Sequence, residues 1–274
     1  MKPVAARTTR GLVALLVAGA LAFPGAGRGD EPELPDSANF TPGSGVRDTL
    51  AASAEPFRAG ESLRFNVQYG MIHAGTAWLE VPETTAWNAH RVWRLVARAE
   101  SNSFFSRFYR VRIRIESLWD QEARFSWHYF EDRHEGGHVS NDSMTYEPDS
   151  SRMRYKNGQT FGVPGPVQDA LSSFYLTRFE ALPIGGRVAF EYHASRKTAV
   201  MEVLVLRREQ VKTPAGRFDC VVIEPLLKAG GIFKNNGRLR IWLTDDQRRM
   251  PVKMESKVAI GSVKVVLQEV KTGG

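Results

Sequence analysis

The segment His134-Glu135-Gly136-Gly137-His138 matches the H-E-x-x-H pattern of zinc proteases. On a helix this spacing places both imidazoles on one face, where they bind Zn²⁺ while the glutamate activates a metal-bound water. A third ligand would have to come from elsewhere in the chain. The pattern therefore predicts a zinc-dependent hydrolase, provided that the segment is helical.

The residues around this motif favour a hairpin over a helix. Gly136 and Gly137 occupy the two variable positions, and each glycine costs a helix about 1 kcal/mol relative to alanine. The flanking residues alternate between apolar and polar, as strands do. We therefore expect a β-turn here and no cofactor. A different metal site, using His128 with His134 and His138, stays open as an alternative, because histidines across a turn can chelate.

Aromatic residues suggest a second kind of site. Trp78, Trp93, Trp119 and Trp242 lie within expected strands, on or beside their apolar faces. A curved antiparallel sheet can enclose an apolar cavity large enough for a ligand. The four tryptophans are thus candidate binding residues for a lipid or another amphiphile, although a core filled by side chains would use them equally well.

The elements that would position these residues are mostly strands. The segment 109–118 alternates strictly, with arginines on one face and Tyr109, Val111, Ile113 and Ile115 on the other. About a dozen such strands follow one another without the rhythm of a parallel sheet. One helix is expected after the cap residue Asp169. This pattern predicts a mainly β fold, either a strongly curved antiparallel sheet or a partly open β-barrel with one helix.

The N-terminus has the three parts of a secretory signal peptide. A basic region carrying Lys2, Arg7 and Arg10 precedes an apolar run at 11–21, and Ala20-Leu21-Ala22 fits a peptidase site. We expect a cleaved signal peptide at 1–22, a flexible linker at 23–55 and a single β domain at 56–272. Export through a cleaved leader leaves no integral membrane span, and the expected location is the periplasm.

Charge and cysteine content exclude some classes of protein. The formal net charge is +7, and three of these charges lie in the leader, so its removal leaves about +4. That is too little, and too scattered, for a nucleic-acid binder. The single cysteine, Cys220, cannot form an intramolecular disulfide and lies in a strand-like run. Nucleophile elbows, phosphate-binding loops and dinucleotide motifs do not occur.

An ordered set of short segments resembles a known family. The set begins with Phe57-Arg58-Ala59-Gly60-Glu61 and continues through Val167-Gln168-Asp169-Ala170-Leu171, Gly216-Arg217-Phe218-Asp219-Cys220 and Arg249-Met250-Pro251-Val252. In this order the segments are similar to the bacterial exported family DUF3108, over roughly residues 56–270. The resemblance implies an exported β-rich domain and no established activity, so it assigns no catalytic residue.

These observations favour a non-catalytic binding or scaffold protein of the cell envelope, with a hydrophobic or amphiphilic envelope ligand as its expected partner. Two alternatives stay open. One is the zinc-dependent hydrolase built on His134 and His138. The other is a module that binds an envelope protein through an exposed apolar patch.

Overall fold

The structure, a computed structural model, describes residues 55–228, 239–257 and 262–274. The expected signal peptide at 1–22 and nearly all of the expected linker at 23–55 lie outside these ranges. Within them, neither helix has the length and apolar content that a membrane span requires.

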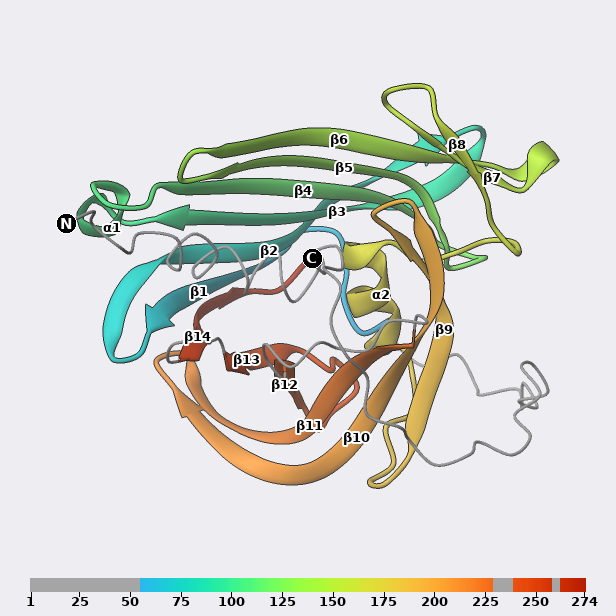
Figure 1. Ribbon diagram of the computed structural model, residues 1–274. Helices are drawn as coiled ribbons and strands as arrows, with labels where there is room; N and C mark the ends of the chain where they lie inside the picture. Colours follow the sequence, from blue (N-terminus) through green and yellow to red (C-terminus); the bar gives the residue numbers. More distant parts are fainter. Residues whose placement is uncertain (1–54, 229–238, 258–261) are drawn as a thin grey trace, which may run out of the picture.

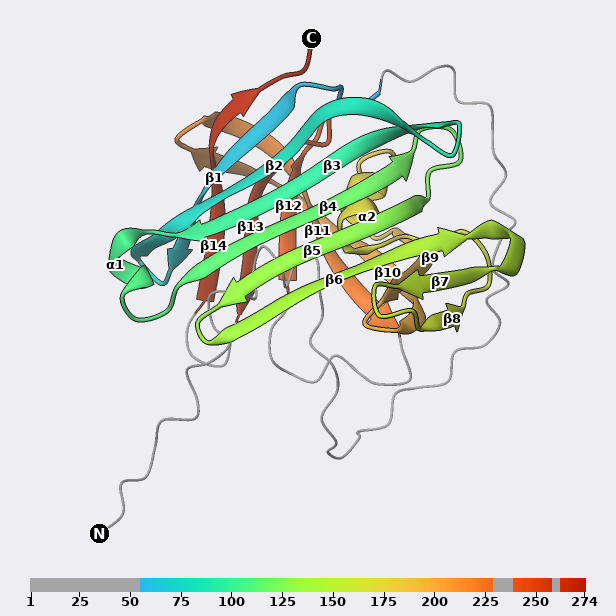
Figure 2. The ribbon, with the colours of Figure 1, turned by 90° about the horizontal axis from the view of Figure 1, so that it is seen from above.

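The described residues form one antiparallel sheet of fourteen strands, in the order β8-β7-β6-β5-β4-β3-β2-β1-β14-β13-β12-β11-β10-β9. The sheet is strongly curved (Figures 1 and 2). The strands are β1 (Glu61–Tyr69), β2 (Ile72–Trp87), β3 (His90–Ser101), β4 (Val111–Asp120), β5 (Ser126–Glu135), β6 (His138–Glu147), β7 (Arg152–Tyr155), β8 (Thr160–Gly162), β9 (Arg187–Ala194), β10 (Lys197–Thr213), β11 (Gly216–Lys228), β12 (Leu239–Thr244), β13 (Pro251–Lys257) and β14 (Ser262–Lys271).

Alternation along the strands separates an inner, concave face from an outer face. In β4, Val111, Ile113 and Ile115 are buried on the inner face, whereas Arg112 and Arg114 point outward. Residues of one parity share a face because the side-chain period of a strand is two. The mainly β fold with a strongly curved, partly open antiparallel sheet is thereby confirmed.

The two edges of the sheet overlap instead of pairing. The register places Tyr155 on the inner face of β7 and His193 on the outer face of β9. The Tyr155 hydroxyl lies 3.1 Å from His193 Nε2, and it accepts a hydrogen bond from the backbone N–H of Arg196. We call this contact between β7 and the β9–β10 hairpin the seam. The sheet is therefore a spiral that is held closed at the seam by side chains.

Residues between β8 and the helix reinforce this closure. The carbonyl of Val167 accepts a hydrogen bond from Ser126 N at the start of β5. Gln168 N donates to Glu191 O, and Gln168 O accepts from His193 N, which makes a parallel bridge to β9. One short segment thus joins β5 to the far edge of the sheet.

Because His193 is buried at the seam, we expect the protein to lose stability in mild acid. Burial lowers the pKa of His193 to about 4, against about 6.5 for a free histidine. Between these pH values His193 is protonated in the unfolded chain but neutral in the folded chain, so the free energy of unfolding falls as the pH drops. We expect His193 to account for about 2–3 kcal/mol of the loss between pH 7 and pH 4.5.

Urea unfolding of the wild type and His193→Gln at both pH values measures this contribution. The variant should lose correspondingly less stability on acidification, whereas His138→Gln, at an exposed turn, should behave like the wild type. An equal acid loss in His193→Gln and the wild type would contradict the assignment.

Three short helical segments accompany the sheet. The longest, α2 (Ala170–Thr177), begins at Asp169 as expected, with a capping box formed by Asp169 and Ser172. A one-turn helix, α1 (Ser103–Ser106), which the sequence did not lead us to expect, connects β3 to β4. The third is a 3₁₀ turn, Pro148–Ser150. Helix α2 lies inside the curve of the sheet, where it packs on β3, β4 and β9 (Figure 1).

Candidate functional site

Helix α2 is fixed in the interior through the buried carboxylate of Asp169. This side chain accepts hydrogen bonds from the backbone N–H groups of Leu171 and Ser172. It also accepts from the hydroxyls of Ser117 on β4, at 2.6 Å, and Ser126 on β5, at 2.5 Å. Burial raises the pKa of Asp169, and the four donors oppose that rise. The carboxylate therefore joins the helix to two strands.

The C-terminal end of α2 is fixed by a buried ion pair. Arg178 is 2% exposed and donates two hydrogen bonds to Glu61 at the start of β1, at 2.6 and 2.9 Å. Its guanidinium also donates to the carbonyls of Pro56 and Arg248. It further lies 4.9 Å from the ring centroid of Phe57. Both ends of α2 are thus anchored, and the helix fills one part of the interior.

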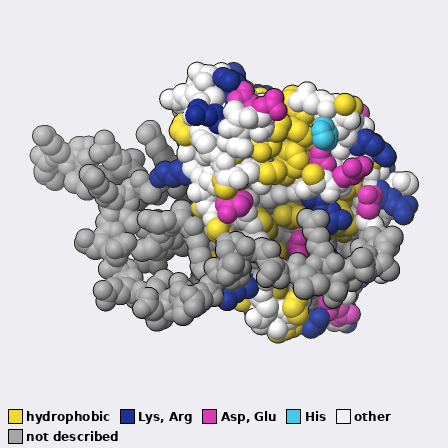
Figure 3. All heavy atoms as spheres, turned by 90° about the vertical axis from the view of Figure 1, so that its right-hand side faces the viewer, with side chains coloured by type: hydrophobic (Ala, Val, Ile, Leu, Met, Phe, Trp, Pro, Cys, Tyr) yellow, Lys and Arg dark blue, Asp and Glu magenta, His cyan; other side chains and the backbone are white. Residues whose placement is uncertain are grey.

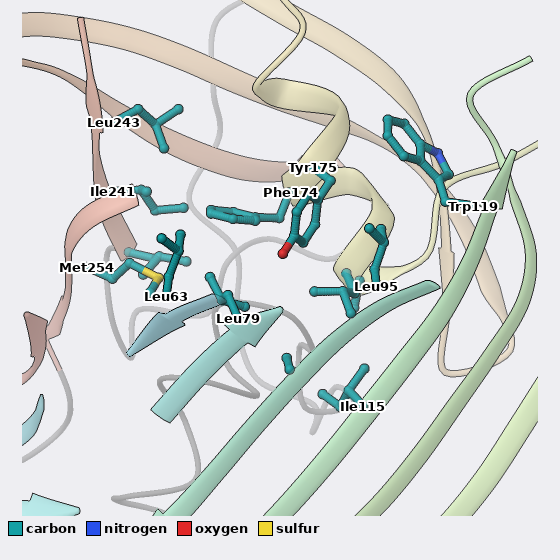
Figure 4. Close-up of a cluster of buried hydrophobic side chains, with 14 of the residues drawn as sticks. Leu63, Leu79, Leu95, Ile115, Trp119, Phe174, Tyr175, Ile241, Leu243 and Met254 are labelled. Atoms are coloured by element: carbon teal, nitrogen blue, oxygen red, sulfur yellow. The ribbon is translucent and has the colours of Figure 1, made fainter. Parts of the chain in front are cut away.

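Aromatic side chains surround the helix. The ring centroids of Trp93 and Trp119 lie 5.3 Å apart, and Phe57 and Phe179 contact both tryptophans. In Figure 4, Tyr175 points from α2 into the apolar interior. Its hydroxyl is fully buried and has no hydrogen-bond partner among the described residues. A buried hydroxyl without a partner costs free energy, so a polar atom of a bound molecule would be stabilised there.

Away from α2, the inner face changes from apolar to charged across neighbouring strands. One row of paired inner residues runs from β2 to β6 as Ala77, Ala99, Ile113, Arg133 and Ser140. The next row runs as Leu79, Ala97, Ile115, Glu131 and Asp142. Adjacent strands lie about 4.8 Å apart, so about 10 Å separates the small residues of β3 from the charges of β5.

The charged residues of β5 form an ordered strip, which we define as Glu131, Arg133 and Glu135. The Arg133 guanidinium lies 2.7 Å from Glu135 and 3.9 Å from Glu131. The Tyr129 hydroxyl donates to Glu131 at 2.9 Å. All three charged side chains are at most 20% exposed. Burial and the neighbouring carboxylates raise the pKa of Tyr129. Charges that face inward need water or polar partners, so this strip marks a polar side of the interior.

Together these features give the inner face two chemically different sides. Small residues line β2 and β3, namely Gly75, Ala77, Ala97 and Ala99, and the charged strip of β5 lies two strands from β3. At the end of the molecule that Figure 3 shows, apolar side chains gather at the centre, with both acidic and basic side chains around them. An amphiphile, with its apolar tail and polar head, matches this division of the inner face into an apolar and a charged side.

The four candidate tryptophans do not converge on one site. Trp93 and Trp119 face inward, whereas Trp78 and Trp242 lie on the outer face. The Arg98 guanidinium stacks over the half-buried Trp78 ring. Trp242 Nε1 donates to Glu209. A role for the inward pair in ligand binding stays a prediction.

The H-E-x-x-H segment is the expected hairpin, with Gly136 at φ +62° in its turn. Residue pairing puts His134 opposite Val139 and Glu135 opposite His138. The two histidines therefore project from opposite faces of the hairpin and cannot share the helical geometry of a zinc protease. His128 lies six residues from His134, about 20 Å along β5. Within the described ranges, no three or more His, Cys, Asp or Glu residues are grouped to hold a metal ion.

Sequence comparison connects this architecture to a family. The sequence profile of DUF3108, described as a protein of unknown function, matches residues 64–268. The chain belongs to the DUF3108 family. The resemblance seen in the sequence is thereby confirmed, and the match extends from β1 into β14. No curated protein matches this DUF3108 chain.

Three solved structures align with the DUF3108 chain. A β-barrel-like protein of the DUF1849 family from Brucella abortus superposes with a TM-score of 0.55 at 6% identity, covering 80% of the DUF3108 chain and 99% of its own. A candidate lipoprotein from Parabacteroides distasonis gives a TM-score of 0.36 at 12% identity, with 79% and 98% coverage. A candidate exported protein with a YmcC-like fold from Bacteroides fragilis gives 0.30 at 14% identity, with the same coverage. Of these, the first shows a shared fold.

Proposed function

We propose that this DUF3108 protein is an exported, non-catalytic binding protein of the bacterial cell envelope, and that its curved sheet holds an amphiphile against the inner face. The tail would lie along the small residues of β2 and β3, and the polar head would lie beside the charged strip of β5. Nothing in this arrangement calls for a cofactor.

The observation that carries the proposal is the division of the inner face. Ala99 and Arg133 belong to one row of paired residues, two strands apart. A fully packed protein core places apolar residues throughout, and it seldom contains three charged side chains on consecutive inward positions. Ligand sites, in contrast, combine apolar walls with a few polar groups that fix orientation. The hydroxyl of Tyr175 on α2 is a further buried polar group of the interior, without a hydrogen-bond partner among the described residues.

Native mass spectrometry of the protein purified gently from its host tests the proposal. We expect a reproducible additional mass in the lipid range that is lost on denaturation. Ala99→Phe adds a ring to the inner face and should remove this mass. Thr76→Phe, which adds the same ring to the outer face of the neighbouring strand, should retain it.

The control for folding is the far-ultraviolet spectrum with a thermal melt. If Ala99→Phe does not fold, the smaller change Ala99→Val should still reduce the fraction of protein that carries the extra mass. A wild-type spectrum with only the bare protein mass, after gentle purification, would contradict the proposal. A stoichiometric zinc adduct that is lost in His134→Ala would favour the metal-dependent alternative instead.

Export rests on the N-terminal sequence and has its own test. The positive residues, apolar run and Ala20-Leu21-Ala22 segment support cleavage after Ala22 and delivery to the periplasm. The intact mass of the exported protein should therefore correspond to residues 23–274. Replacing Ala20 and Ala22 with arginine should leave the leader attached, because the peptidase requires small residues there. An unprocessed wild-type mass would show that the leader is retained.

A further inference from the structure

Three connections at one end of the sheet expose large apolar side chains. They are the β1–β2 turn, the segment around α1 and the β5–β6 turn, and they lie at the same end of the molecule in two views (Figures 1 and 2). Each of five apolar side chains here is more than half exposed, and Met71 is fully exposed. We call these five residues the apolar rim: Met71, Ile72, Phe104, Phe108 and Val139.

Hydrogen bonds hold the three connections together. Asn102 Nδ2 donates to the carbonyl of His73 in β2 at 2.7 Å, which joins α1 to the first turn. Gly136 N donates to Arg110 O at 2.7 Å, which joins α1 to the third turn. A side chain at Gly136 would collide with the Tyr109 ring, so glycine permits this close approach. The apolar rim is therefore fixed in place before it meets a partner.

The three connections that form the apolar rim carry basic and no acidic side chains. The segments 70–74, 102–110 and 136–139 contain no aspartate or glutamate, whereas Arg107 and Arg110 are exposed. The nearest carboxylates belong to neighbouring strands. Glu135 is paired with Arg133. Glu100, on β3, is exposed and lies opposite Arg112 of β4 in the strand register. This surface differs from the face in Figure 3, where acidic and basic side chains both surround the apolar area.

We propose that the apolar rim docks onto the surface of an anionic lipid bilayer. Single apolar side chains at the tips of separate turns enter the boundary between headgroups and acyl chains, and adjacent arginines attract anionic lipid. The absence of carboxylates in these three segments complements a negatively charged surface. This inference does not depend on a ligand in the interior.

Vesicle sedimentation with the full chain tests the proposal. The protein is expressed with its own leader, and its mass is measured so that a retained leader is recognised in every variant. We expect binding to vesicles of phosphatidylcholine and phosphatidylglycerol, and much weaker binding to phosphatidylcholine alone. Phe104→Ser with Phe108→Ser should weaken binding by about tenfold or more. Arg107→Gln with Arg110→Gln should weaken it by about tenfold, as should added salt.

Ile184→Ser is the matched control, because Ile184 is a similarly exposed apolar residue outside the apolar rim, and it should bind as the wild type does. Equal binding by the wild type and the two rim variants would overturn the proposal, as would equal binding to neutral and anionic vesicles. A dimer in sedimentation velocity that dissociates in the phenylalanine variant would assign the apolar rim to a second copy of the chain and also overturn it.

Discussion

Arg178→Met is expected to lower the free energy of unfolding by about 3–5 kcal/mol, because it leaves Glu61 buried without its partner. The pair connects the end of α2 to the start of β1, and both side chains are at most 8% exposed. The substituted side chain also gives up the hydrogen bonds to Pro56 O and Arg248 O. Urea unfolding at neutral pH measures the loss.

Two further variants separate the buried charge from the lost packing. Arg178→Met combined with Glu61→Met should be more stable than Arg178→Met alone, because no unpaired charge remains in the interior. Arg154→Met removes an exposed arginine that pairs with Glu147, and its stability should be unchanged within error. If the stability loss of the double variant equals the sum of the losses in Arg178→Met and Glu61→Met, the two residues are not coupled.

Asp169→Ala is expected to have the second largest effect, a loss of about 3–4 kcal/mol. The change removes the cap of α2 and leaves the buried hydroxyls of Ser117 and Ser126 without their acceptor. Combining Asp169→Ala with Ser117→Ala and Ser126→Ala should recover part of the loss, since the orphaned hydroxyls disappear. Urea unfolding measures both variants, and the triple variant should not be less stable than Asp169→Ala.

Asp169→Asn distinguishes the cap from the charge. Asparagine caps helices about as well as aspartate, so α2 should keep its N-terminus. The amide has a single oxygen, which cannot serve the two backbone donors and both serines. We therefore expect Asp169→Asn to fall between the wild type and Asp169→Ala. A variant as stable as the wild type would contradict the role of the carboxylate in joining β4 and β5.

Local signals predicted the strands and the helix well. The alternation in 109–118 corresponds to β4, and the cap at Asp169 marks the start of α2. The two glycines of the H-E-x-x-H segment correctly favoured a hairpin. These features depend on neighbouring residues, so one sequence is enough to find them.

The orientation of single side chains was harder to predict, although the alternation along a strand indicates which face each side chain lies on. Trp78 lies between the inward residues Ala77 and Leu79, so its own side chain must face outward. The same parity, continued from Tyr129, places Glu131 on the inner face. Charged residues usually face solvent, so the sequence did not lead us to expect a charged strip on the inner face of β5. The seam could not be predicted, because it joins residues far apart in the sequence.

The seam has a mechanical consequence. A closed barrel can widen only by breaking a whole ladder of main-chain hydrogen bonds, whereas this sheet can loosen at Tyr155, His193 and the short Gln168 bridge with every strand pair intact. Opening there leaves the strand ladders in place, so it needs less free energy than global unfolding. The backbone amides of β9 should therefore exchange with solvent deuterium sooner than those of the central strands. The two edges of the sheet can therefore separate and reassociate at the seam while the hydrogen-bonded strands between them keep their arrangement.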